Sequence, residues 1–167
     1  MSNIIVFITF LISLVVFGHE GENHINEDEG WETVTEKIPE ETLRRINLDY
    51  LARVKPIFKN KCLDCHGTGN PMPWYAGIPG PKQLIQNDIK EAKEHMDMSN
   101  DFPFEGHGTP KDDLEALNKT VKENTMPPIQ YKILHWSSSL TEDEKRTVNK
   151  WVADSLKLLT KSNEEEK

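Results

Sequence analysis

The chain is poor in cysteine. It has only two in 167 residues, and both lie in the segment NKCLDCHGTG, residues 60–69. Two thiols are too few for a four-ligand zinc site, and no histidine pair follows at zinc-finger spacing. A disulfide between Cys62 and Cys65 would close a very small loop and stabilise little. The alternating pattern of strands is also missing, which argues against a thioredoxin-like redox couple. The disulfide interpretation also leaves His66, directly behind the second cysteine, without a role.

The chain also lacks a run of about 20 apolar residues, the length that a membrane-spanning helix needs. Its longest apolar run covers residues 4–17, which carry no charge and are interrupted only by Thr9 and Ser13. This length suits the apolar region of a secretion signal, so we predict a signal peptide over residues 1–18. An uncleaved segment acting as a membrane tether is the alternative. In both cases we expect the rest of the chain to be periplasmic or otherwise extracytoplasmic.

An excess of basic charge is absent as well. Residues 19–30 hold five acids, no Lys or Arg and a single aliphatic residue, and we predict an acidic flexible spacer over 19–36. Residues 31–167 then hold 23 acidic and 20 basic residues, a net charge of only −3. A nearly neutral domain gives no electrostatic reason to bind nucleic acid.

What the chain does have is apolar residues at helical spacing. We predict a small, mostly α-helical domain over residues 37–160, followed by a polar tail at 161–167. Helices are expected after Pro39, with a break at Pro56, from Pro79–Pro81 to about Met98, from the N-cap Thr109, and from the capping box Thr141–Glu144. Long irregular loops are expected at 67–78, 99–108 and 125–139. The residues expected to face inward are Leu43, Ile46, Tyr50, Leu51 and Val54; Leu84, Ile85, Ile89, Ala92 and Met96; Leu114, Leu117 and Val121; and Val148, Trp151, Val152, Leu156 and Leu159.

The Cys-x-x-Cys-His motif itself predicts a covalently bound haem. The thiols of Cys62 and Cys65 would form thioethers with the two vinyl groups, and His66 would become the proximal iron ligand. Export fits this interpretation, because haem is attached covalently outside the bacterial cytoplasm. Short helices with long loops form a thin core, and we expect one haem c to fill its middle.

The second axial ligand is the other residue to predict. Met126 in ENTMPPIQ lies 60 residues beyond His66, and the two prolines after it stiffen its loop. We therefore predict Met126 as the distal ligand. The residues considered and set aside are Met72, Met96, Met98, His95, His107 and His135.

Four segments in order, VKPIFKNKCLDCHG, PWYAGIP, TMPP and SLTEDEKRTVNKWV, resemble a small bacterial haem-binding domain family of single-haem relatives of cytochrome c. The resemblance covers about residues 50–155. It implies a helical domain around one haem, with the distal ligand at Met126.

His/Met ligation predicts a one-electron carrier between exported or membrane-bound redox proteins rather than an enzyme. A haem-dependent peroxidase-like enzyme or a gas-binding sensor, each with an open sixth position, is the alternative. Two further sets of residues are candidates with two possible roles. Lys55, Lys59 and Lys61 would ring the haem edge or form a solvated helix face. Trp74, Tyr75, Trp136 and Trp151 would line the haem pocket or fill the core.

Overall fold

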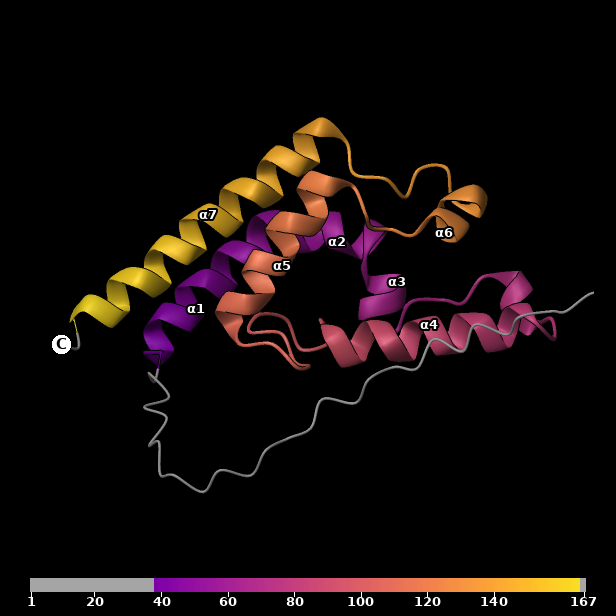
Figure 1. Ribbon diagram of the computed structural model, residues 1–167, viewed down its shortest axis with the longest axis horizontal. Helices are drawn as coiled ribbons and strands as arrows, with labels where there is room; N and C mark the ends of the chain where they lie inside the picture. The colour runs from indigo at the N-terminus through magenta and orange to yellow at the C-terminus, as the bar shows by residue number, and fades with distance from the viewer. Residues whose placement is uncertain (1–37, 166–167) are drawn as a thin grey trace, which may run out of the picture. The chain divides into compact units, whose positions relative to one another are not determined.

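The first helical stretch changes its pitch halfway along in the computed structural model, which describes residues 38–165 (Figure 1). It comprises α1 (Glu40–Asp49), the π-helical turn η1 (Tyr50–Val54) and α2 (Lys55–Lys61). Pro56 has no N–H to give to the carbonyl of Ala52, and just before it the backbone N–H of Lys55 bonds to Tyr50 O, five residues back. The break predicted at Pro56 is therefore a change of pitch within a continuing helix.

Helices make up the rest of the regular structure. They are α3 (Leu63–His66), the 3₁₀ turn η2 (Trp74–Gly77), α4 (Pro81–His95), α5 (Pro110–Glu123), α6 (Ile129–Leu134) and α7 (Glu142–Glu165). Between residues 38 and 165 the extended backbone pairs only at an isolated bridge of Asp97 with Glu105. The prediction of a mostly α-helical fold is confirmed. No helix within this range is both long and apolar enough to cross a bilayer. The predicted signal peptide (1–18) and spacer (19–36) lie outside the described residues.

Reciprocal caps fix the starts of the two longest core helices. The backbone N–H of Asp112 donates to Thr109 Oγ1 over 3.3 Å, and the backbone N–H of Thr109 donates to the Asp112 carboxylate over 3.0 Å. The Thr141–Glu144 pair does the same at 3.2 and 2.7 Å. Both predicted helix starts are confirmed, because each cap satisfies N–H groups that the first turn leaves free. α7 continues to Glu165, past the predicted domain end at residue 160.

The core forms where α7 packs against α1, η1 and α5 (Figure 1). Trp151 is completely buried at its centre, with its ring 5.5 Å from that of Tyr50 and 5.8 Å from that of Phe102. Its Nε1–H donates to Ile46 O over 3.3 Å. Phe102 and Phe104 enter this cluster from the 99–108 loop. Among the residues predicted to face inward, those buried in the core are Ile46, Tyr50, Val54, Met96, Leu114, Leu117, Val121, Val148, Trp151, Val152 and Leu159.

Two of the predicted inward-facing residues are exposed, and α4 is the helix most affected. Leu84 is 55% exposed and Leu51 is also exposed, so both predictions are wrong. No residue of α4 is buried, because this helix contacts α3 and η2 instead of the core helices. Its apolar residues Ile85 and Ile89 are half-buried along a groove. Met96 is buried as predicted, but it lies just after the helix has ended.

The segment 125–139, predicted as an irregular loop, contains the short helix α6. No residue of α6 is buried, and several large apolar side chains on and after this helix are exposed. These are Ile129, Ile133, Leu134 and Trp136. A helix with no buried face gives no core-facing pattern to recognise, and two prolines directly precede this one.

Candidate functional site

The two cysteines and the histidine lie on a single turn. Cys62 is the N-cap of α3, and its carbonyl accepts hydrogen bonds from the backbone N–H groups of Cys65 (3.2 Å) and His66 (3.0 Å). Residues three apart in a helix are neighbours on one face, so this turn brings the two side chains together. Both thiols are free, and no disulfide joins them.

Burial makes these thiols poor nucleophiles. It is the main cause that raises the pKa of Cys62 to about 12, and the neighbouring Cys65 adds to the effect. The pKa of Cys65 is also raised, first by burial and then by the negative charges of Asp64 and Asp88. A reactive thiol couple needs the opposite, a lowered pKa that yields thiolate near neutral pH. The surroundings of the pair therefore argue against the redox-couple interpretation.

His66 is held at its side chain and at its main chain by the segment that follows α4. Its Nδ1 lies 2.8 Å from Met96 O, and its own carbonyl accepts the backbone N–H of Met98 over 2.7 Å. Burial is the largest influence on the ring and lowers the pKa of His66, which keeps the imidazole neutral at pH 7. A carbonyl only accepts, so Nδ1 must carry the proton and Nε2 keeps its lone pair. Metal-ligating histidines are commonly oriented in this way.

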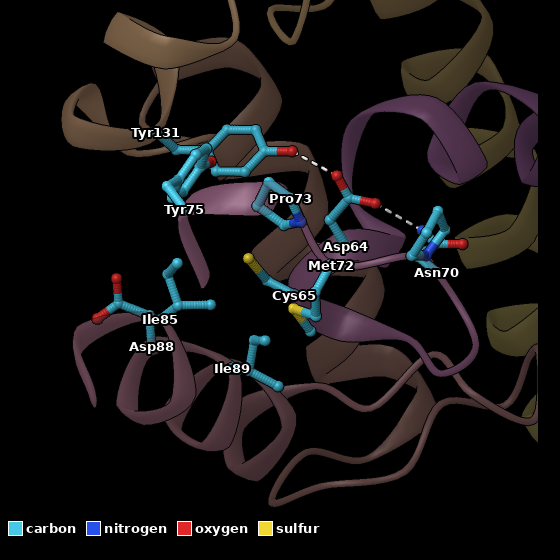
Figure 2. Close-up of a pocket in the computed structure, with 11 residues that line it drawn as sticks. Asp64, Cys65, Asn70, Met72, Pro73, Tyr75, Ile85, Asp88, Ile89 and Tyr131 are labelled. Atoms are coloured by element: carbon cyan, nitrogen blue, oxygen red, sulfur yellow. Dashed lines mark hydrogen bonds between the residues drawn. The ribbon is translucent and has the colours of Figure 1, made fainter. Parts of the chain in front are cut away.

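An apolar groove lies beside Cys65, with polar groups at its edge (Figure 2). We call it the Cys65 groove. Its apolar lining consists of Pro71, Met72, Pro73, Tyr75, Ile85 and Ile89, and its polar lining consists of Asp64, Asn70, Asp88 and Tyr131. The half-buried face of α4 therefore turns toward the cysteine motif. An apolar hollow with a few polar groups at its edge is typical of a site for a largely apolar cofactor.

Hydrogen bonds join the motif to α6 and η2 along this edge, as Figure 2 shows in part. Asp64 accepts from Tyr131 Oη over 2.5 Å and from Asn70 Nδ2 over 2.7 Å. The Tyr131 ring stacks on His135 with 4.0 Å between the ring centroids, and His135 Nε2 lies 3.2 Å from Tyr75 Oη. Burial, followed by the bond to Asp64, raises the pKa of Tyr131, so the phenol stays a donor. We call these five residues the rim network, and no local sequence pattern predicted it.

Met126 lies on a different element from His66. It follows α5, precedes Pro127 through a cis peptide bond and is 50% exposed. The residues that line the Cys65 groove include Met72 but not Met126. Ligation of iron by Met126 therefore stays a prediction.

The other ligand candidates are distributed between core and surface. Met96 and Met98 are buried in the core cluster. His95 and His107 are exposed and face each other with ring centroids 5.9 Å apart. His135 belongs to the rim network.

Two of the three lysines before the motif have partners within the chain. Lys61 donates to the carbonyls of Ser137 and Ser139 and is only 12% exposed. Lys55 pairs with Asp101 over 2.6 Å. Of the aromatic residues proposed as pocket walls, Tyr75 lines the groove and Trp151 fills the core. Trp74 and Trp136 are exposed.

Comparison with known proteins identifies the family. The model of a family described as a haem-binding domain matches residues 31–154, which is most of the chain. The chain belongs to this haem-binding domain family. The resemblance drawn from the motifs is thus confirmed. The haem-binding domain also resembles the cytochrome c peroxidase Ccp of Escherichia coli (strain K12), with 29% identity over 99 residues.

That second match covers 55% of this chain and 20% of the peroxidase, so the chain matches about a fifth of the relative's length. No solved structure matches the chain.

The residues of the motif fit a haem. Two free thiols stand one helical turn apart, and the histidine after them is neutral and held at Nδ1. The groove beside Cys65 supplies an apolar wall. Among residues 38–165, no group of three His, Cys, Asp or Glu side chains could hold a metal ion.

Proposed function

We propose that this haem-binding domain carries one haem c and passes single electrons between exported or membrane-bound redox proteins. Cys62 and Cys65 would hold the haem through thioethers, with His66 and Met126 as axial ligands. The observation that carries the proposal is the contact of His66 Nδ1 with Met96 O over 2.8 Å, an orientation in which Nε2 would be the nitrogen that binds iron. When bound, the haem supplies a one-electron couple at iron.

The side chains of the motif have distinct roles in this proposal. Cys62 and Cys65 would each add sulfur to one carbon of a vinyl group and hydrogen to the other, so attachment would consume no oxidant or reductant. His66 would hold the iron to a buried main-chain segment. Ile85 and Ile89 would exclude water from the cofactor, and a less polar site favours the less charged ferrous state.

Met126 would complete the coordination with a thioether, which raises the reduction potential. Pro127 and Pro128 restrict the backbone after it, and this rigidity supports a weak iron–sulfur bond that a mobile loop would lose. With both axial positions filled, peroxide and gases would have no open site at the iron. The proposal therefore favours a carrier over an enzyme.

The match to a cytochrome c peroxidase supports a second candidate, a role in peroxide reduction. The matched part is a fifth of that protein, and this chain has a single Cys-x-x-Cys-His motif. In this alternative the domain either has an open sixth position and reacts with peroxide, or supplies electrons to a separate peroxide-reducing haem protein. An open sixth position would also suit a gas sensor.

The optical spectrum of the haem-loaded full chain separates these functions. A low-spin spectrum with the weak long-wavelength sulfur-to-iron band is expected for wild type. Met126→Ala should keep the covalent haem, lose this band and lower the reduction potential. Met72→Ala is the matched control, because Met72 is the methionine in the groove and should leave the band unchanged.

Two results would overturn the carrier proposal in part or in full. Loss of the band in Met72→Ala instead of Met126→Ala would move the ligand to Met72. A high-spin ferric wild type that binds CO or peroxide rapidly would support the enzyme or the sensor.

A further inference from the structure

The rim network connects the cysteine motif to the loop that carries Met126. We propose that Tyr131 and Asp64 are positioning residues that hold Met126 in place as the distal ligand. This inference rests on the proposed function, because it gives the hydrogen bond a role only if Met126 binds iron.

Asp64 is the fixed end of this connection. It lies between Cys62 and Cys65, so two thioether bonds would tie its backbone to the edge of the haem. Its carboxylate accepts from Tyr131 Oη over 2.5 Å, a length typical of a charge-assisted hydrogen bond. Asn70 donates to the other carboxylate oxygen over 2.7 Å and so fixes the orientation of the group.

A short, stiff stretch of backbone leads from Tyr131 back to Met126. The carbonyl of Pro128 accepts the backbone N–H groups of Tyr131 and Lys132, both over 3.1 Å, so Pro128 is part of the first turn of α6. Lys132 Nζ also donates to the carbonyl of Asn124 over 3.2 Å, which closes the loop on the other side of Met126. These hydrogen bonds attach the loop that carries Met126 to α6.

His135 fixes the ring of Tyr131 from its opposite side. Its Nδ1 lies 3.1 Å from the carbonyl of Tyr131, which can only accept, so Nδ1 carries the proton. Nε2 then accepts the hydroxyl hydrogen of Tyr75 over 3.2 Å. The stacked Tyr131 and His135 rings and the bond to Tyr75 leave the Tyr131 hydroxyl directed at Asp64 (Figure 2).

The position of α6 explains why one hydrogen bond should matter. No residue of α6 is buried, so this helix adds nothing to the hydrophobic core. Its described hydrogen bonds to other elements run from Tyr131 to the cysteine motif and from Lys132 to the end of α5, and its C-cap His135 adds a bond to Tyr75 of η2. Removing the first should loosen the Met126 loop while the core around Trp151 stays folded.

Tyr131→Phe in the haem-loaded full chain tests the inference. We expect the covalent haem, seen by haem staining, and the helical circular dichroism to equal those of wild type. The sulfur-to-iron band should weaken, and added imidazole should bind the ferric iron about 10–100-fold more tightly, since outer-shell partners have effects of this size. Asp64→Asn should give the same changes, and the double variant should add little to either, because both remove one interaction.

Tyr50→Phe is the matched control. It makes the same chemical change at a buried tyrosine of the core whose hydroxyl has no hydrogen-bond partner. Its sulfur-to-iron band and imidazole affinity should equal those of wild type.

The outcomes distinguish this inference from the proposed function. If wild type shows the band and Tyr131→Phe binds imidazole no better than Tyr50→Phe, the positioning role is wrong while Met126 ligation stands. If wild type lacks the band, Met126 ligation itself fails and the inference fails with it. Should Tyr131→Phe lose helical signal, Asp64→Asn with wild-type imidazole affinity would equally overturn the positioning role.

Discussion

Large apolar side chains are buried on one side of this domain and exposed on the other. On the core side, where α7 packs on α1, η1 and α5, Trp151 and Tyr50 are completely buried. On the groove side, formed by α3, η2, α4 and α6, Trp74 is 84% and Trp136 is 91% exposed. The difference indicates that the core side is complete with protein side chains alone, whereas the groove side offers apolar surface that the described chain does not cover.

This comparison bears on one expectation from the sequence. We expected a haem to fill the middle of a thin helical core, and where the core helices meet, Trp151 packs with Tyr50, Phe102 and Phe104. In the proposed function the haem would lie beside this aromatic cluster, at the groove that Cys65 lines. The two sides should therefore respond differently to substitution.

Loss of both cysteines should have the largest effect, mainly on the groove side, because Cys65 lines the groove while Cys62 packs against the edge of the core. Cys62→Ala with Cys65→Ala should abolish covalent haem completely, because no other thiol exists in the chain. The core helices should remain, so far-ultraviolet circular dichroism should still show a helical protein that unfolds cooperatively. Haem staining after denaturing electrophoresis measures the first effect. A variant without helical signal would show that the core depends on the cofactor, contrary to the comparison.

The next largest difference, in the free energy of unfolding, should be between variants of one buried and one exposed tryptophan. Trp151→Ala should lower the free energy of unfolding by about 3–5 kcal/mol, because it leaves a cavity among buried rings. Trp136→Ala should change it by no more than about 0.5 kcal/mol, as is usual for an exposed side chain. Urea denaturation of the haem-loaded proteins measures both values. Equal losses would mean that Trp136 is covered once the haem is bound.

The smallest effect on stability should come from the carboxylate of Asp113, on the core side. Asp113 is buried, one of its carboxylate oxygens has no hydrogen-bond partner, and burial is the main cause that raises its pKa to about 6. Between about pH 4 and pH 6 the unfolded chain releases this proton while the folded chain keeps it, so stability falls as the pH rises through this window.

Asp113→Asn should remove that loss. The free energy of unfolding of the variant, relative to wild type, should rise by about 1–3 kcal/mol between pH 4 and pH 7. Thermal or urea unfolding at the two pH values measures the change. A relative stability that does not vary with pH would show that Asp113 ionises freely in the folded protein.

The sequence predicted the core side better than the groove side, and the reason is physical. Thr109 and Thr141 cap their helices through contacts with residues three positions away, which a local pattern contains. The stripes of α5 and α7 are buried against other protein segments, so their spacing reports the core directly. The Cys-x-x-Cys-His turn was recognisable for the same reason, because its three residues act within one turn.

The groove side depends on contacts that a local pattern does not contain. The partner of His66 Nδ1 is a carbonyl 30 residues away, and any residue type could supply it. Leu84 was placed inward because the stripe of α4 looks like a core stripe, although that helix packs mainly against α3 and η2. Tyr131 and Asp64 are 67 residues apart, and neither stands out among ordinary polar residues.

The hydrogen bonds of Met96 and Met98 to His66 connect the cysteine motif to the core as well as to the groove. The same chain segment continues into the loop that inserts Phe102 and Phe104 beside Trp151. The core side of the domain thus helps to set the orientation of the His66 ring, the proposed iron ligand. A substitution among these aromatic residues should therefore shift the absorption spectrum and the reduction potential of the haem-loaded protein before it unfolds the domain.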